Sequence, residues 1–314
     1  MVGDMKPPPP QRGDRTTPVP VTVVHACLRD GTGGSPTAVV SDSGALDDAA
    51  RRRIPALART SHAVFVDAPP DGGEAAVRFF TVEGELPACG HGTVAALAYL
   101  AERTDPLANG RQQTTLRATA TGQPIDGLTA RQQGLLTADF AVAPVRLREP
   151  ASDELSLLLS ALGLPRARPA AIATLGRPRL LVQAPSHAAL RGLVPDLAAL
   201  DDACRRLDLL GCYVYADPVA PGGRLAARMF APAIGVPEDI ANANSTACLA
   251  AALHATGAVG TSASRSGRLA VDMGDSLGSP ATITATVTAV AGGPPRVLVG
   301  GTARIGPTLH LDLA

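Results

Sequence analysis

The chain of 314 residues has no Trp, only 3% aromatic residues and a single lysine, Lys6. The scarcity of aromatic rings removes the platforms on which nucleic-acid-binding proteins stack bases. Lys and Arg together number 28, the same as Asp and Glu, so no excess of positive charge favours a phosphate backbone. We therefore expect no nucleic-acid partner. Because Lys6 precedes the expected folded part, a pyridoxal enzyme anchored by a lysine Schiff base is also excluded.

Long apolar runs are absent, since Arg, Asp or Pro interrupts each one, and we expect no membrane-spanning segment. The five cysteines are odd in number and have no C-x-x-C spacing, which indicates a reduced, cytoplasmic protein without a structural metal. The N-terminal stretch MVGDMKPPPPQRGDRTTP has no apolar signal region. It predicts a disordered Pro-rich tail over residues 1–19.

Hydrophobic residues make up 46% of the chain, which is enough for two domains with buried cores. Most of the remaining segments are β-branched and strand-like, but residues 93–103 and 245–256 form two apolar helical stretches. A helix with no polar face is expected to be buried. The sequence therefore predicts an α+β fold of two domains, each a strand-rich sheet wrapped around one central buried helix.

The two halves repeat a local pattern. Arg78-Phe-Phe-Thr-Val leads through an acidic loop into the first apolar helix, and Arg228-Met-Phe-Ala-Pro leads through Glu238-Asp239 into the second. This repetition predicts a duplication in which two helix N-termini face each other. We assign residues 20–146, with a C-terminal strand at about 300–314, to the first domain. Residues 147–299 form the second.

Paired helix N-termini predict an anion site, because free backbone N–H groups and the positive ends of both helix dipoles point into the gap. A substrate carboxylate held there would be polarised, and its neighbouring C–H would become more acidic. One or two acid/base groups beside that carbon would then suffice for an isomerase or epimerase. Such an enzyme needs no metal and no organic cofactor.

The first helix begins at Ala-Cys-Gly-His-Gly-Thr. Cys89 is either a base whose pKa is lowered by the helix N-terminus or a small buried residue. Gly92 would let a ligand approach the backbone closely. His91 is expected to bind substrate or orient the loop. The candidate substrate-binding residues here are Gly90, His91, Gly92 and Thr93.

The second helix begins within Glu-Asp-Ile-Ala-Asn-Ala-Asn-Ser-Thr, which has more side chains able to cap a helix than one helix needs. This surplus favours a ligand pocket formed by Asp239, Asn242, Asn244 and Ser245. His62 is polar at the start of a strand, and a lone histidine at such a position is more often structural.

The motifs resemble the PhzF-like (phenazine biosynthesis) family of the diaminopimelate-epimerase-like fold. The matching segments of this chain are GGSPTAVV, RFFTVEGELPACGHGTVAALAYL, RMFAPAIGVPEDIANANSTACLAAAL and the closing GGTARI. The resemblance covers about residues 20–306. It implies the fold predicted above, an isomerase without a cofactor, and a homodimer.

Three departures from the family pattern bear on function. The resemblance places His62, in RTSHAVFV, where the family has its catalytic Glu. Asn242 and Asn244 replace Thr and Ser of the second loop, whereas the acidic residue is kept as Asp239. The segment VDMGDSLGSPA matches the family poorly. The first helix start also resembles that of proline racemases, but Asn242 stands in the place of their second cysteine, which disfavours a two-thiol racemase.

We therefore predict a proton-transfer isomerase or epimerase for a small carboxylate-bearing, amino-acid-derived metabolite. His62 would be one acid/base group, since imidazole titrates near neutrality, and Asp239 or Cys89 the other. The resemblance extends to isomerases of 4-alkyl-proline biosynthesis, which implies a role in antibiotic or other specialised metabolism. The alternatives are a non-catalytic ligand-binding protein and an epimerase or dehydratase centred on Cys89.

Overall fold

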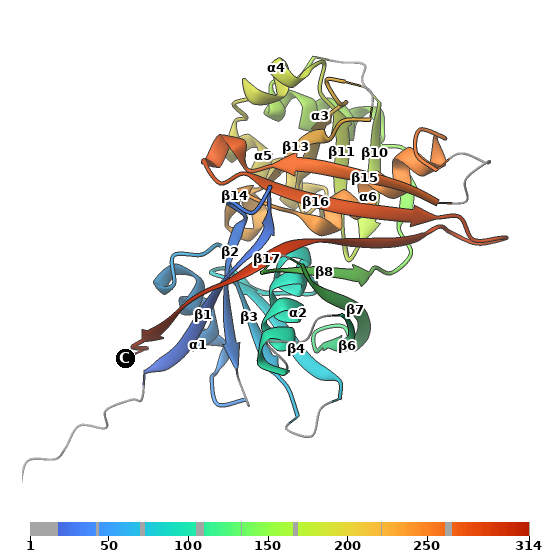
Figure 1. Ribbon diagram of the computed structural model, residues 1–314. Helices are drawn as coiled ribbons and strands as arrows, with labels where there is room; N and C mark the ends of the chain where they lie inside the picture. The colour runs from blue at the N-terminus through green and yellow to red at the C-terminus, as the bar shows by residue number, and fades with distance from the viewer. Residues whose placement is uncertain are drawn as a thin grey trace, which may run out of the picture.

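The computed structural model describes residues 18–41, 44–69, 73–104, 110–132, 134–165, 169–220, 222–260 and 266–313. Residues 1–17 of the expected tail lie outside this range, and the first strand begins at Val19. None of the described helices is long and apolar enough to cross a membrane. The fold is the predicted α+β arrangement of two halves, each with strands around one central helix (Figure 1).

In the first half, a closed ring of strands surrounds helix α2. The ring runs in the order β1, β2, β3, β4, β6, β7, β8 and β17, and returns to β1. Its elements are β1 (Val19–Leu28), β2 (Ser35–Ser41), β3 (His62–Asp67), β4 (Ala75–Thr81), β6 (Arg111–Ala118), β7 (Gln123–Gln132), β8 (Leu135–Ala141), β17 (Arg296–Leu311) and α2 (Gly90–Thr104). The short strand β5 (Gly84–Leu86) pairs with β4, and helix α1 (Asp48–Leu57) packs outside the ring.

In the second half, strands β9 to β13, β15, β16 and β17 form a continuous sheet around helix α6. Helices α3 and α5 pack against each other, and an apolar cluster lies between these helices and the sheet. The elements are β9 (Arg146–Arg148), α3 (Ser152–Leu162), β10 (Ala170–Leu175), β11 (Arg177–Gln183), α4 (His187–Arg191), α5 (Leu197–Arg206), β12 (Cys212–Ala216), β13 (Leu225–Ala231), η1 (Pro232–Ile234), β14 (Val236–Asp239), α6 (Ala243–Ala255), β15 (Ser266–Met273), η2 (Asp275–Leu277) and β16 (Ala281–Thr288).

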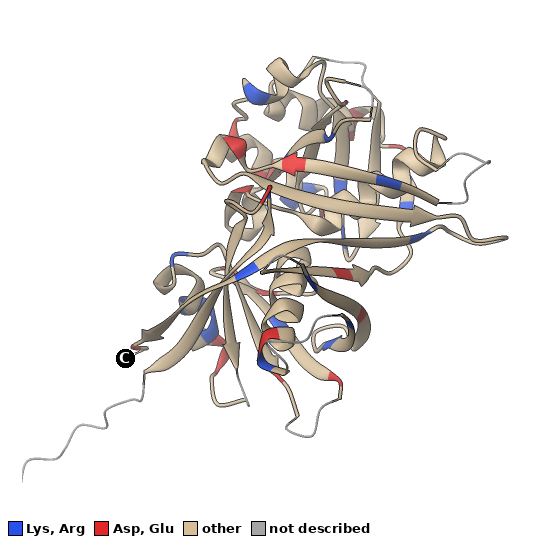
Figure 2. Ribbon diagram, viewed as in Figure 1, with Lys and Arg blue, Asp and Glu red and all other residues tan. Residues whose placement is uncertain are grey.

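Strand β17 joins the halves. Its first residues pair with β16 of the second half, its middle residues with β8, and eight residues between Thr302 and Leu311 with β1 of the first half. In Figure 1 it runs as a long red strand between the two central helices. Basic and acidic residues are interspersed over both halves (Figure 2).

Both predicted central helices are buried. In α2, the side chains from Gly90 to Tyr99 are all buried, and in α6 those from Ala243 to Ala251 are buried. Because neither helix has a polar face, each is stable only when strands surround it. The same apolar cluster contains residues of both helices, so the two cores are continuous.

Candidate active site

The N-termini of α2 and α6 meet head to head, as the sequence predicts. Gly90 is the first residue of α2, and a Cβ atom built on it would lie 2.7 Å from the Cβ of Ala243 and 2.8 Å from the backbone nitrogen of Asn244. Only glycine leaves room for this approach. The helix ends therefore present their unpaired N–H groups and positive dipole ends to one shared site.

An arginine–glutamate pair holds the loop before each central helix. Arg78 of β4 contacts Glu85 through Nε, at 2.9 Å, and through Nη2. Arg228 of β13 contacts Glu238 in the same way, at 2.9 and 2.7 Å. Bidentate pairs of this kind fix orientation as well as distance. The motif that is repeated in the sequence therefore forms the same Arg–Glu ion pair in each half, and this pair positions the start of the central helix.

A small cavity lies between the halves, with a volume of about 40 Å³. From the first half it is lined by His62, Cys89, Gly90 and His91. From the second half it is lined by residues that include Asn242 and Asn244. This volume is smaller than the roughly 300–1,000 Å³ of common ligand pockets.

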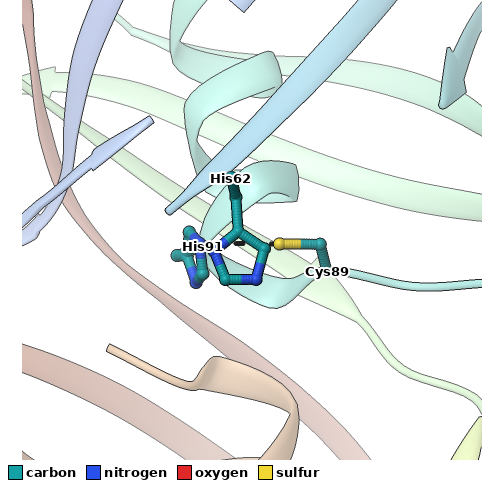
Figure 3. Close-up of side chains that lie close together, drawn as sticks. All are labelled: His62, Cys89 and His91. Carbon is teal, nitrogen blue, oxygen red and sulfur yellow. Dashed lines mark hydrogen bonds between the residues drawn. The ribbon is translucent and has the colours of Figure 1, made fainter. Parts of the chain in front are cut away.

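His62, Cys89 and His91 form a compact cluster at this cavity (Figure 3). The rings of His62 and His91 are 4.3 Å apart between centroids and nearly perpendicular, at 84°. His91 Nδ1 lies 2.7 Å from the carbonyl oxygen of Ala241, so this nitrogen must be the donor. Its Nε2 lies 3.6 Å from Cys89 Sγ. His62 Nδ1 is 2.9 Å from Ser61 Oγ. When Nδ1–H donates to that hydroxyl, the Nε2 lone pair is the basic one.

The environment moves the two histidine pKa values in opposite directions. Burial lowers the pKa of His62 well below 6.5, and the charge of His91 lowers it further. Burial also acts to lower the pKa of His91, but the charges of Cys89 and Asp239, with hydrogen bonds to Cys89 and to the Ala241 carbonyl, raise it to about 10. At neutral pH His62 is therefore a neutral base beside a protonated His91.

Asp239 lies behind His91 rather than at the cavity wall. Its Oδ2 is 3.8 Å from His91 Nδ1 and accepts a hydrogen bond from Asn242 Nδ2 at 2.9 Å. Burial raises the pKa of Asp239, although the His91 charge and the Asn242 hydrogen bond oppose this shift. Asn242 in turn accepts a bond from Ser245 N and caps α6. Asp239 therefore stabilises protonated His91 and the α6 cap.

Three predicted substrate-binding residues do not line the cavity. A Cβ on Gly92 would lie 2.9 Å from Cys89 Sγ, so this glycine makes room for the thiol rather than for a ligand. Thr93 donates through Oγ1 to the Cys89 carbonyl within α2. Ser245 is fully buried and accepts a hydrogen bond from Arg179.

The His62–Cys89–His91 cluster is also the one group of side chains, among the described residues, with the composition and spacing to hold a metal ion. Its candidate ligand atoms all lie within 4.8 Å of one another, and imidazole and thiolate ligands suit Zn²⁺. Sequence spacing gave no sign of this group because His62 lies on strand β3, whereas Cys89 and His91 lie at the start of helix α2. A metal there would occupy both acid/base side chains, so an isomerase without a metal stays our prediction.

Two arginines that the sequence analysis did not single out, Arg177 and Arg179, also line the cavity. The signal was present in the sequence, because both precede the apolar run Leu180–Val182 of a strand. A charged residue at the buried start of such a run is a candidate for a specific interaction.

Comparison with known proteins indicates that this chain is an enzyme. The sequence model of the family described as "Phenazine biosynthesis-like protein" (PhzC-PhzF) matches residues 24–306. An uncharacterized isomerase of Deinococcus radiodurans is 30% identical over 284 residues, which cover 87% of this chain and 88% of the relative. The trans-2,3-dihydro-3-hydroxyanthranilate isomerase of Pseudomonas aeruginosa is 32% identical over 236 residues, covering 73% and 77% of the two chains.

The fold is shared with solved structures. A phenazine biosynthesis protein of the PhzF family from Bacillus anthracis superposes with a TM-score of 0.78 at 17% identity. The match covers 94% of this chain and 99% of the other.

Proposed function

Because the chain belongs to the PhzC-PhzF (phenazine biosynthesis-like) family and is an isomerase, we propose that it shifts a proton between two carbons on one face of its substrate. The substrate is a small, unsaturated or cyclic, amino-acid-derived carboxylate of a specialised pathway. Its carboxylate binds at the N-termini of α2 and α6, where the N–H groups stabilise the charge that develops as the neighbouring C–H is broken.

The compactness of the cluster carries this proposal. One ring nitrogen each of His62 and His91 and the sulfur of Cys89 lie within 4.8 Å of one another. Because His91 is protonated at neutral pH, His62 and Cys89 are the two members of the cluster that can accept a proton. Two bases that invert a carbon stand on opposite sides of it, each about 3 Å away and hence roughly 6 Å apart. Groups as close as these act from the same side. The geometry favours removal and return of the proton on one face over two-base epimerisation.

His62 carries the proton in this mechanism. It is neutral and can accept a proton, but its imidazolium form would stand beside protonated His91, with ring centroids 4.3 Å apart. Repulsion between the like charges favours rapid return of the proton to the substrate. Because His62 is only 3% exposed, bulk water has little access to the proton while the histidine holds it.

The alternative is an epimerase or dehydratase centred on Cys89, favoured by the contact between Cys89 Sγ and His91 Nε2. Replacing Cys89 with Ser separates the two mechanisms. If His62 carries the proton, Cys89→Ser lowers turnover by much less than the ~10²–10⁴-fold worth of a general acid/base group. A drop of that size, measured by NMR of substrate conversion, would favour the Cys89 mechanism.

The pH dependence of turnover follows from the two histidine shifts. His62 must be neutral to accept a proton, and its lowered pKa places the acid limb of kcat/KM below pH 6.5. His91 must stay protonated because its charge favours return of the proton from His62 to the substrate. Its pKa of about 10 places the alkaline limb near pH 10. We expect a plateau between the two limbs. An acid limb centred at or above pH 6.5 would show that a different base acts.

A further inference from the structure

Arg179 is a buried cation without a counter-ion. It is 2% exposed and lines the cavity, yet within the described part of the chain no carboxylate lies within ion-pair distance of it. Nη1 donates to Ser245 Oγ at 3.1 Å, and Nη2 donates to the carbonyl oxygens of Leu175, at 2.5 Å, and Arg177, at 2.8 Å. Nε–H has no acceptor in the same part of the structure. One buried donor therefore remains for a ligand.

At position 179, a protein core ordinarily has an apolar side chain. Residues 177, 179 and 181 of β11 share a face of the sheet, and Leu181 belongs to the apolar cluster around α6. An unpaired charge in such surroundings is strongly unfavourable. Burial accordingly lowers the pKa of Arg179. An anion bound in the cavity would remove this penalty.

The internal duplication relates Arg179 to a position beside His62, the residue that carries the proton. Since Arg78 corresponds to Arg228, Phe80 of β4 corresponds to Phe230 of β13. Phe80 pairs with Ala63 of β3, and Phe230 pairs with Cys212 of β12. Residue 63 of the first half is therefore equivalent to residue 212 of the second.

The neighbouring strands extend this equivalence. Ala63 pairs with residue 38 of β2, and Cys212 pairs with residue 180 of β11. One position earlier on each strand, His62 corresponds to Gly211 and Thr37 corresponds to Arg179. The first half thus supplies the imidazole, and the second half supplies a guanidinium from the adjacent strand.

We propose that Arg179 is the counter-ion of the substrate carboxylate, which it binds through Nε–H while the N-termini of α2 and α6 contact the same group. Its hydrogen bond to Ser245, in the first turn of α6, holds the guanidinium at that helix end. This inference rests on the proposed function for the presence of a carboxylate. It adds that a free, ionised carboxylate is obligatory, so esters and amides of the substrate are excluded.

Binding of small probes tests the proposal without knowledge of the natural substrate. Isothermal titration calorimetry would compare a panel of acids, among them L-proline and pyrrole-2-carboxylate, with the corresponding amides and with inorganic phosphate. The variants are Arg179→Met, which removes the charge, and Arg179→Lys, which keeps the charge but lacks Nε–H. The matched control is Arg117→Met, since the Arg117 side chain is half exposed and pairs with Glu74, and neither residue lines the cavity.

Wild type and Arg117→Met should bind at least one acid and none of the amides. Arg179→Met should lose roughly 10- to 100-fold in affinity for the acid, the usual worth of a hydrogen bond to a charged group, and Arg179→Lys should lie between. The melting temperature of Arg179→Met should match or exceed that of wild type, because this variant lacks the unpaired buried charge. If Arg179→Met does not fold, the Arg179→Lys affinity decides.

Several results would overturn the proposal. They are equal binding of acids and amides by wild type, no binding of any acid, unchanged affinity in the Arg179 variants, and Arg179-dependent binding of phosphate in preference to carboxylates. The outcome is separable from that of the proposed function. A protein that binds carboxylates through Arg179 but transfers no proton supports this inference alone, whereas isomerisation that survives Arg179→Met supports only the proposed function.

Discussion

Replacing His62 with Ala is expected to lower turnover by about 10²–10⁴-fold, the usual worth of general acid–base catalysis. The imidazole is the neutral base at the cavity, and no carboxylate that could take its role is among the described residues that line the cavity. Affinity for a carboxylate ligand should be retained, because the helix N-termini bind that group. Steady-state turnover and calorimetric binding, measured on the same preparation, separate the two effects.

His310→Ala is the matched control, since this histidine is exposed on β17 and does not line the cavity. Its turnover should equal that of wild type. Wild-type turnover in His62→Ala would contradict the mechanism in which His62 carries the proton. Cys89, with His91 and Asp239, would then be the acid/base system.

Replacing Gly90 with Ala should disrupt both stability and activity. The new methyl group would lie 2.7 Å from Ala243 Cβ and 2.8 Å from the nitrogen of Asn244, and neither atom belongs to a flexible side chain that could turn away. Overpacking of this kind costs about 1–3 kcal/mol in the free energy of unfolding. Relief of the clash separates the two helix N-termini, and a displacement of about 1 Å at a catalytic site can lower turnover ~10²-fold.

Urea unfolding and turnover measure the two consequences. Gly293→Ala is the matched control, because the nearest atom to a Cβ there is a side-chain carbon at 3.7 Å and its φ is not left-handed. That variant should change stability by less than about 0.5 kcal/mol. Wild-type stability and turnover in Gly90→Ala would show that contact between the helix ends is not required.

The sequence predicted the two central helices and their meeting point because these features have local causes. An apolar helix without a polar face must be buried, and the repeated Arg-to-Glu motif marks the loop before each helix. The equivalence of Arg78–Glu85 with Arg228–Glu238 in the structure reflects the same repetition. Fold class was therefore accessible from pattern and resemblance together.

The residues that line the cavity were harder to predict from the sequence, because they come together through pairings between strands that are distant in the chain. Position 62 reaches Cys89 and His91 only because β3 lies in the ring around α2. Arg179 reaches the site through the parallel pairing of β11 with β12, which no local pattern specifies. The capping residues of α6 were identified, but sequence alone could not separate Asn244, which lines the cavity, from Ser245, which does not.

The central claim, proton transfer on one face of the substrate, is tested most directly by running the reaction in D₂O and locating deuterium in the product by NMR. Because His62 is buried and its imidazolium is disfavoured beside His91, most product molecules should keep the original hydrogen, moved to another carbon on the same face. Deuterium that enters should be at that carbon alone. One full equivalent of deuterium at a carbon whose configuration has been inverted would contradict the claim and establish a two-base epimerase.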